Sequence, residues 1–138
     1  MTLHHRRQLK LVTIDYFSGF ITCDGIPRET TEAVTKALAD NFSKLGLPEQ
    51  LISDNGPCFR SGFREFCEQL DIKHRTVSPH FHQSNGRVER AIQTVKQMLK
   101  KAKNNTELAI AMTTYLDTPV SEMLPSPAEL FFGRRINT

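Results

Sequence analysis

Alternation of apolar and polar side chains marks the first strands of the chain. Leu9–Phe17 alternates in this way and is rich in β-branched and aromatic residues, which predicts a strand. Ser18-Gly19 predicts a turn, and Phe20–Ile26 predicts the returning strand of a hairpin. Two later apolar runs, Leu47–Asp54 and Ile72–Val77, predict two more short strands.

Apolar residues at helical spacing predict helices between and after these strands. In chain order we expect one helix from Thr30 or Thr31 to Gly46, a short one around Phe63–Leu70, a long one over about Asn85–Lys103, one over Thr106–Tyr115, and a last one opening at the capping box Ser126-Pro127-Ala128-Glu129. The polar stretch Ser78–Gly86 predicts a loop. Alternation of strands and helices after the hairpin predicts parallel strands with helices on the sheet faces, a mixed α/β fold.

Composition sets limits on this picture. The 138 residues suffice for one domain, 1–138, with a buried core. A formal charge of +3 and a pI of about 8.9 are compatible with a polyanionic partner. Three cysteines without CxxC spacing predict reduced thiols in an intracellular protein. No run approaches the roughly 18 apolar residues of a membrane helix, so we expect no membrane partner.

The segment Ile52-Ser53-Asp54-Asn55-Gly56 raises the first question of chemistry. Asp-Asn-Gly is a good turn sequence, because Asn and Gly tolerate positive φ. A carboxylate at the C-terminal end of a strand is equally well placed to be a metal ligand. Taken alone, this part of the sequence leaves both interpretations open.

The long helix carries a second candidate. At 3.6 residues per turn, one of its faces holds a carboxylate, an amide and three amines, namely Glu89, Gln93, Lys96, Lys100 and Lys103. An ordinary solvated face with a favourable first-turn glutamate explains this pattern. A carboxylate that binds a metal, followed by amines that bind phosphates, explains it too. Carboxylates that converge repel one another unless divalent cations such as Mg²⁺ neutralise them.

Three segments together resemble a known family. SDNGPCF, then FCEQLDIKHRTVSPHFHQSNGRVERAIQTVKQMLKK, then YLDTPVSEMLPSPAELFFGRR are similar to the integrase catalytic core of long-terminal-repeat retroelements, most like the gypsy type. The resemblance implies the ribonuclease H-like fold, a mixed five-stranded sheet flanked by helices. It also implies metal-dependent phosphoryl transfer on DNA, in which element ends are joined to a target.

The resemblance assigns roles to individual residues. Asp54 matches the second catalytic aspartate and Glu89 the catalytic glutamate, which implies that both bind Mg²⁺ or Mn²⁺. Lys96 lies where the family uses a lysine against DNA, and Asn85 lies in the loop that positions DNA. With Gln93 and Lys100, these two form the expected DNA-binding set.

The first catalytic aspartate of the family has no match in this chain. Counted back, its position falls at about Met1, and residues 1–10 show neither the aspartate nor the apolar pattern of the strand that carries it. The first strand of the fold is therefore expected to be missing. Asp15 is acidic and lies in a strand, but we interpret it as a structural carboxylate and regard its role as a metal ligand as doubtful. His80 and His82 hint at zinc, but no cysteine pair accompanies them.

Three functional hypotheses follow. The chain is an integrase-like polynucleotidyl transferase core, active if the third carboxylate is supplied. Alternatively, it is a catalytically inactive or co-opted element remnant that serves as a DNA-binding or oligomerisation module. A ribonuclease H-type nuclease shares the metal chemistry but lacks the closing motif. The resemblance further implies a homodimer and a nuclear location.

Overall fold

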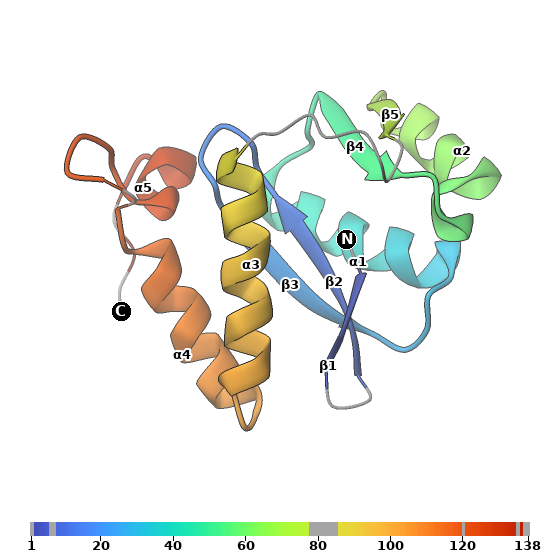
Figure 1. The fold of residues 1–138 in the computed structure, drawn as a ribbon. Coiled ribbons are helices and arrows are strands. Elements are labelled where there is room, and N and C mark those ends of the chain that lie inside the picture. The colour runs from blue at the N-terminus through green and yellow to red at the C-terminus, as the bar shows by residue number, and fades with distance from the viewer. Residues whose placement is uncertain (1, 6–7, 78–85, 120, 135, 137–138) are drawn as a thin grey trace. The chain divides into compact units, whose positions relative to one another are not determined.

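The computed structural model describes residues 2–5, 8–77, 86–119, 121–134 and 136, and only the backbone of residues 2–5, 8 and 86–89. Its elements are, in chain order, β1 (Thr2–His5), β2 (Gln8–Ile14), β3 (Ile21–Ile26), α1 (Thr31–Leu45), β4 (Gln50–Asp54), the 3-10 turn η1 (Pro57–Phe59), α2 (Ser61–Gln69), β5 (Lys73–Val77), α3 (Gly86–Lys101), α4 (Asn105–Leu116) and α5 (Pro127–Phe132) (Figure 1). The residues gather into two compact units, Met1–Val12 with Cys23–Gln83, and Thr13–Thr22 with Ser84–Thr138.

The expected hairpin is present. β2 and β3 are neighbours in a three-stranded sheet of order β1-β2-β3. The turn between them is closed by the Asp15 amide donating to the Phe20 carbonyl and the Gly19 amide donating to the Asp15 carbonyl, at 2.8 and 2.7 Å. Gly19 has a φ of 76°, a left-handed conformation that glycine adopts without steric cost. Ser18-Gly19 is therefore the turn that the sequence predicts.

One prediction about the N-terminus is wrong. The sequence gives no strand pattern in residues 1–10 before Leu9, yet β1 pairs antiparallel with β2, from Thr2 opposite Leu11 to His5 opposite Gln8. Ladder hydrogen bonds to a neighbouring strand stabilise β1, so the segment needs no apolar alternation of its own. The described residues thus contain five strands, the number implied by the resemblance.

The other two strands pair in parallel, as predicted. β4 and β5 run side by side from Gln50 opposite Lys73 to Asp54 opposite Val77. In the described part of the chain they form a sheet separate from β1-β2-β3, whereas a single five-stranded sheet was expected. The β1 ladder is only four residues long, and it ends at the Thr2–Leu11 pair.

Helix α1 covers the core of the first unit. The Thr30 hydroxyl accepts a hydrogen bond from the Ala33 amide at 3.2 Å and so caps the helix, while Gly46, with a φ of 97°, ends it. Val34 and Leu38 are buried on its inner face. The buried cluster that they join contains Leu9, Leu11, Ile26, Val34, Leu38, Cys58, Phe59, Phe63, Cys67 and Ile72. This core holds β4, η1 and α2 around the candidate site.

The second unit is mainly helical. Ala91, Val95 and Leu99 are buried along α3, which packs against α4. Ser126 caps α5 by accepting a hydrogen bond from the Glu129 amide at 3.2 Å, which confirms the predicted capping box. Phe20, from the turn before β3, stacks on Phe131 with ring centroids 4.6 Å apart. Among the described residues, no helix is both long and apolar enough to cross a membrane.

Candidate functional site

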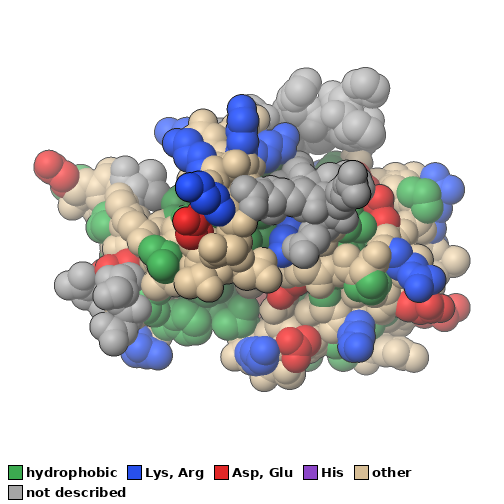
Figure 2. Space-filling view, turned by 90° about the horizontal axis from the view of Figure 1, so that it is seen from below, with side chains coloured by type: hydrophobic (Ala, Val, Ile, Leu, Met, Phe, Trp, Pro, Cys, Tyr) green, Lys and Arg blue, Asp and Glu red, His purple; other side chains and the backbone are tan. Residues whose placement is uncertain are grey.

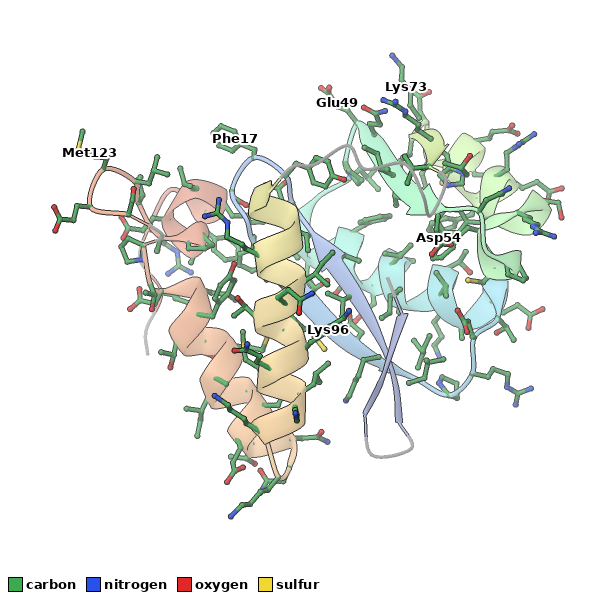
Figure 3. The ribbon with its side chains drawn as sticks, viewed as in Figure 1. Phe17, Glu49, Asp54, Lys73, Lys96 and Met123 are labelled. Atoms are coloured by element: carbon green, nitrogen blue, oxygen red, sulfur yellow. The ribbon has the colours of Figure 1, made fainter. Side chains whose placement is uncertain are left out.

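Asp54 is the last residue of β4, and its carboxylate is exposed (Figure 3). The parallel partner β5 ends opposite it at Val77. One carboxylate oxygen, Oδ1, accepts a hydrogen bond from the Gly56 amide at 2.8 Å. Among the described residues, the other oxygen, Oδ2, has no hydrogen-bond partner. The turn therefore fixes the carboxylate and leaves one oxygen available to a ligand, so turn and ligand roles coexist at this residue.

Gly56 is required at this turn for space rather than for its φ. Its φ is −64°, and neither Asn55 nor Gly56 has a positive φ. The prediction that this turn uses the tolerance of Asn and Gly for positive φ is therefore wrong. A Cβ atom at position 56 would lie 2.8 Å from Asp54 Oδ1, closer than real Cβ contacts allow. Glycine thus permits the amide of residue 56 to reach the carboxylate.

A second contact network lies beside Asp54, between β4 and β5. Ser53 Oγ and His74 Nε2 are 2.7 Å apart, and Ser53 Oγ donates to the Asp54 carbonyl at 2.9 Å. The His74 ring also meets the edge of Phe63, with centroids 4.9 Å apart. Burial, and to a lesser degree the Arg64 guanidinium, lower the pKa of His74 below its usual 6.5. The imidazole is therefore neutral at pH 7.

The lowered pKa of His74 predicts a pH-dependent stability. As the pH falls below 6.5, the unfolded chain takes up a proton at residue 74 that the folded chain accepts only at lower pH. The contribution of neutral His74 to the free energy of unfolding is thus fully present above its ordinary pKa of 6.5. It is lost as the pH falls from there through the lower pKa of His74 in the folded chain. We expect the free energy of unfolding in urea to drop more between about pH 7.5 and about pH 5.5 for the native chain than for His74→Gln. Equal drops in the two proteins would contradict a lowered pKa of His74 in the folded chain.

Asp15 has a different environment from Asp54. Its Oδ2 accepts hydrogen bonds from both the amide and the hydroxyl of Ser18, at 2.9 and 2.6 Å. Ser18 is fully buried, and its hydroxyl in turn accepts a bond from the Phe20 amide at 3.0 Å. The Asp15 carboxylate thus holds the turn between β2 and β3. This geometry supports its interpretation as a structural residue.

The polar face of α3 carries the remaining candidates. Gln93, Lys96 and Lys100 are exposed on it (Figure 3 labels Lys96), and Figure 2 shows Lys and Arg side chains gathered over the C-terminal end of this helix. Glu89 lies in the first turn of α3, with only its backbone described. Asn85, His80 and His82 lie outside the described residues, as do residues 78–85 of the predicted loop, whereas Gly86 begins α3.

The predicted pair Asp54 and Glu89 falls in different units, the first unit holding Asp54 and the second Glu89. Their convergence therefore stays a prediction. Within the described ranges, no three His, Cys, Asp or Glu side chains are grouped as a metal site would require. Asp54 offers an exposed carboxylate oxygen, of the hard donor type that Mg²⁺ prefers.

Two features beside Asp54 were not predicted. His74 was placed in the strand Ile72–Val77 without a partner, and Gly56 was expected to act through a positive φ rather than through the space that it leaves. The parallel register that brings His74 to Ser53 depends on how far β5 is shifted along β4, which neither segment reveals alone. The three cysteines are free thiols, as expected, and burial raises the pKa of both Cys58 and Cys67.

Comparison with known proteins places the chain in a family. The integrase core domain family matches residues 4–82, more than half of the chain. The Gag-Pro-Pol polyprotein of Mason-Pfizer monkey virus is 45% identical over 93 residues, which cover 67% of this chain and 5% of that protein. The Gag-Pol polyprotein of avian reticuloendotheliosis virus is 35% identical over 131 residues, 89% of this chain and 11% of that protein. The chain therefore spans a small part of the length of these relatives.

Solved structures show the same fold. The catalytic core domain of BIV integrase matches with a TM-score of 0.81 and 24% identity, over 96% of this chain and 91% of that one. The HTLV-2 integrase catalytic core domain in complex with magnesium matches with a TM-score of 0.75 and 25% identity, over 95% and 90% of the two chains. The strands and helices described above thus form the ribonuclease H-like fold of integrase catalytic cores. Taken with the family match, the chain belongs to the integrase core domain family.

Proposed function

We propose that the chain acts in DNA integration, as a core that binds DNA and holds a divalent cation, Mg²⁺ or Mn²⁺, with Asp54 and Glu89. The observation that carries the proposal is the Asp54 carboxylate at the end of β4, bound at Oδ1 by the Gly56 amide and without a hydrogen-bond partner at Oδ2 among the described residues. The magnesium complex of the HTLV-2 core supports the choice of cation. When bound, such ions activate the attacking oxygen and stabilise the leaving oxygen in phosphoryl transfer.

The residues of this chain would contribute in separate ways. Asp54 supplies an oxygen whose direction is set by the Asx turn, so little side-chain entropy is lost when a cation binds. Glu89, in the first turn of α3, supplies the second carboxylate. Lys96 and Lys100, exposed further along α3, bind DNA phosphates, assisted by Gln93 and Asn85. The face of α3 thus combines a metal ligand with phosphate contacts.

Removing the two lysines is expected to weaken DNA binding and its salt dependence. Each phosphate contact releases condensed counterions, so Lys96→Ala with Lys100→Ala should make the slope of log K against log salt shallower by about 1.8 and weaken binding by at least about tenfold at low salt. Fluorescence anisotropy with a labelled duplex measures both quantities. The matched control is Lys36→Ala with Lys44→Ala, which removes the same charge from exposed positions of α1. Equal losses in the two double variants would contradict the role of α3.

A second candidate function is a DNA-binding or oligomerisation module without catalysis. It is favoured by the two hydrogen bonds from Ser18 that engage the carboxylate of Asp15 in a turn. Asp54 and Glu89 then provide two carboxylates, while two-metal phosphoryl transfer in this family uses three. The relative in HTLV-2 has been solved in dimeric and trimeric forms, which supports self-association as part of either candidate. For both we propose a nuclear location.

A DNA-joining assay separates the two candidates. The chain of residues 1–138 is incubated with a labelled duplex end, target DNA and Mn²⁺, beside its Asp54→Asn, Glu89→Gln and Asp15→Asn variants. Without a third carboxylate, we expect DNA binding but no joined product. Joined product that disappears in all three variants would contradict this expectation and would make Asp15 the third ligand.

A further inference from the structure

The backbone carbonyl of Asp54 is connected to the interior of the first unit by a short chain of contacts. Ser53 Oγ lies 2.7 Å from His74 Nε2 and donates to the Asp54 carbonyl oxygen at 2.9 Å. His74 comes from β5, where it pairs in register with Leu51, two residues before Ser53. Side chains two apart on a strand share a face, so His74 is positioned to reach the Ser53 hydroxyl.

The direction of these hydrogen bonds follows from the number of protons. A serine hydroxyl has one proton, and Ser53 donates it to the Asp54 carbonyl. With that proton used, Ser53 Oγ is left to accept from His74 Nε2, and on this basis we assign the ring proton to Nε2. A neutral ring with its proton on Nε2 and a doubly protonated ring both donate at this atom. The contact consequently requires a donor at the Nε2 position and does not depend on the charge of the ring.

His74 is itself held in place from the other side. Its ring packs edge-on against Phe63, a fully buried residue at the centre of the core, at 4.9 Å between centroids. Phe63 is fixed in turn by Phe59, 5.0 Å away between centroids in a T-shaped contact. The imidazole thus links the core, through Phe63, to Ser53 near the end of β4.

Asp54 is consequently restrained at two points. The Ser53 hydroxyl holds its backbone carbonyl, and the Gly56 amide holds its side-chain Oδ1. The first contact limits rotation of the peptide plane that follows Asp54, and the second limits rotation of the carboxylate. A side chain that leaves an exposed strand end would otherwise sample several rotamers.

We infer that His74 and Ser53 are positioning residues for Asp54: the Nε2–H of His74 orients the Ser53 hydroxyl, which fixes the Asp54 peptide so that the Gly56 amide meets the carboxylate. The functional meaning of this arrangement rests on the proposed role of Asp54 as a metal ligand. The arrangement itself does not, because it concerns the geometry of the turn in the chain without metal.

The test measures the solvent exchange rate of the Gly56 amide by NMR in the chain of residues 1–138. We expect exchange to become about tenfold faster in His74→Ala, which removes the bond to Ser53 Oγ, and at least as fast in Ser53→Ala, which removes both bonds of that hydroxyl. His74→Gln, which keeps an N–H donor near the Nε2 position, should retain a rate within about twofold of the native one. The control is Thr76→Ala, which removes a hydroxyl from an exposed residue opposite Ser53 in the register.

Two results would overturn the inference. One is an unchanged Gly56 rate in His74→Ala and Ser53→Ala, whatever the loss in thermal stability. The other is equal acceleration in His74→Gln and His74→Ala, which would make the donor irrelevant. Should His74→Ala fail to fold, Ser53→Ala and His74→Gln still decide the question.

A parallel calorimetric titration with Mn²⁺ keeps this result separate from the proposed function. Asp54→Asn is compared with Asp71→Asn, a matched change at an exposed residue whose φ of 55° asparagine tolerates. Equal Mn²⁺ affinity in the two variants would contradict Asp54 as a metal ligand, while the exchange rates would still decide the positioning role of His74 and Ser53.

Discussion

Replacing Phe63 with alanine is expected to lower the free energy of unfolding by about 3–5 kcal/mol, within the range seen for buried aromatic residues. Phe63 is fully buried in the first unit and contacts the rings of Phe59, Phe66 and His74, with centroids 5.0, 5.9 and 4.9 Å away. Truncation leaves a cavity that these neighbours fill only in part. Because the free energy of unfolding of a domain is typically about 5–15 kcal/mol, this loss is a large fraction of the total stability. Urea unfolding followed by circular dichroism measures the change.

Phe17→Ala is the matched control for this substitution. Phe17 is 74% exposed in the turn after β2, where Figure 3 shows it labelled. Its truncation should change the free energy of unfolding by no more than about 0.5 kcal/mol. A loss at Phe63 as small as that at Phe17 would mean that the described core does not stabilise the β4–β5 edge.

The second large effect is expected at Gly56. Gly56→Ala would place a Cβ 2.8 Å from Asp54 Oδ1, so the carboxylate must rotate away and lose its bond to the amide of residue 56. A hydrogen bond to a charged group contributes about 1.5–3 kcal/mol, which corresponds to Mn²⁺ binding weakened by about tenfold to a hundredfold if the turn orients the ligand. Isothermal titration calorimetry with Mn²⁺ gives the affinity.

Gly25→Ala provides the comparison for Gly56→Ala. A Cβ at Gly25 would meet Lys10 Nζ at 3.6 Å, an ordinary van der Waals distance. That variant should bind Mn²⁺ as the native chain does. Unchanged affinity in Gly56→Ala, or the same loss in both variants, would show that the contact between Gly56 and Asp54 does not orient a metal ligand.

Features that depend on neighbours in the sequence were predictable. Thr30 and Ser126 cap their helices, and Gly46 ends α1, because each acts through hydrogen bonds or φ values within a few residues. The parallel pairing of β4 and β5 also follows from local pattern, since a helix separates the two strands. Such features need no knowledge of the rest of the fold.

Features that depend on residues distant in the sequence were harder to predict. β1 forms because β2 is beside it, although its own sequence lacks alternation. The contact between His74 and Ser53 exists only in the observed register of β4 and β5, and the space requirement at Gly56 appears only once the Asp54 rotamer is known. At the candidate site, the sequence identified Asp54 as an exposed strand-end carboxylate but not the groups that hold it.

If Asp54 and Glu89 bind the same metal ion, Mn²⁺ must broaden the backbone amide signals around both residues. We expect selective paramagnetic broadening of two segments at low Mn²⁺ concentration, Asn55-Gly56 after β4 and Glu89-Arg90 in the first turn of α3. Both should be lost together in Asp54→Asn and in Glu89→Gln, and both should persist in Asp71→Asn. Broadening confined to one segment, or insensitive to Asp54→Asn, would contradict a metal ion bound by both residues.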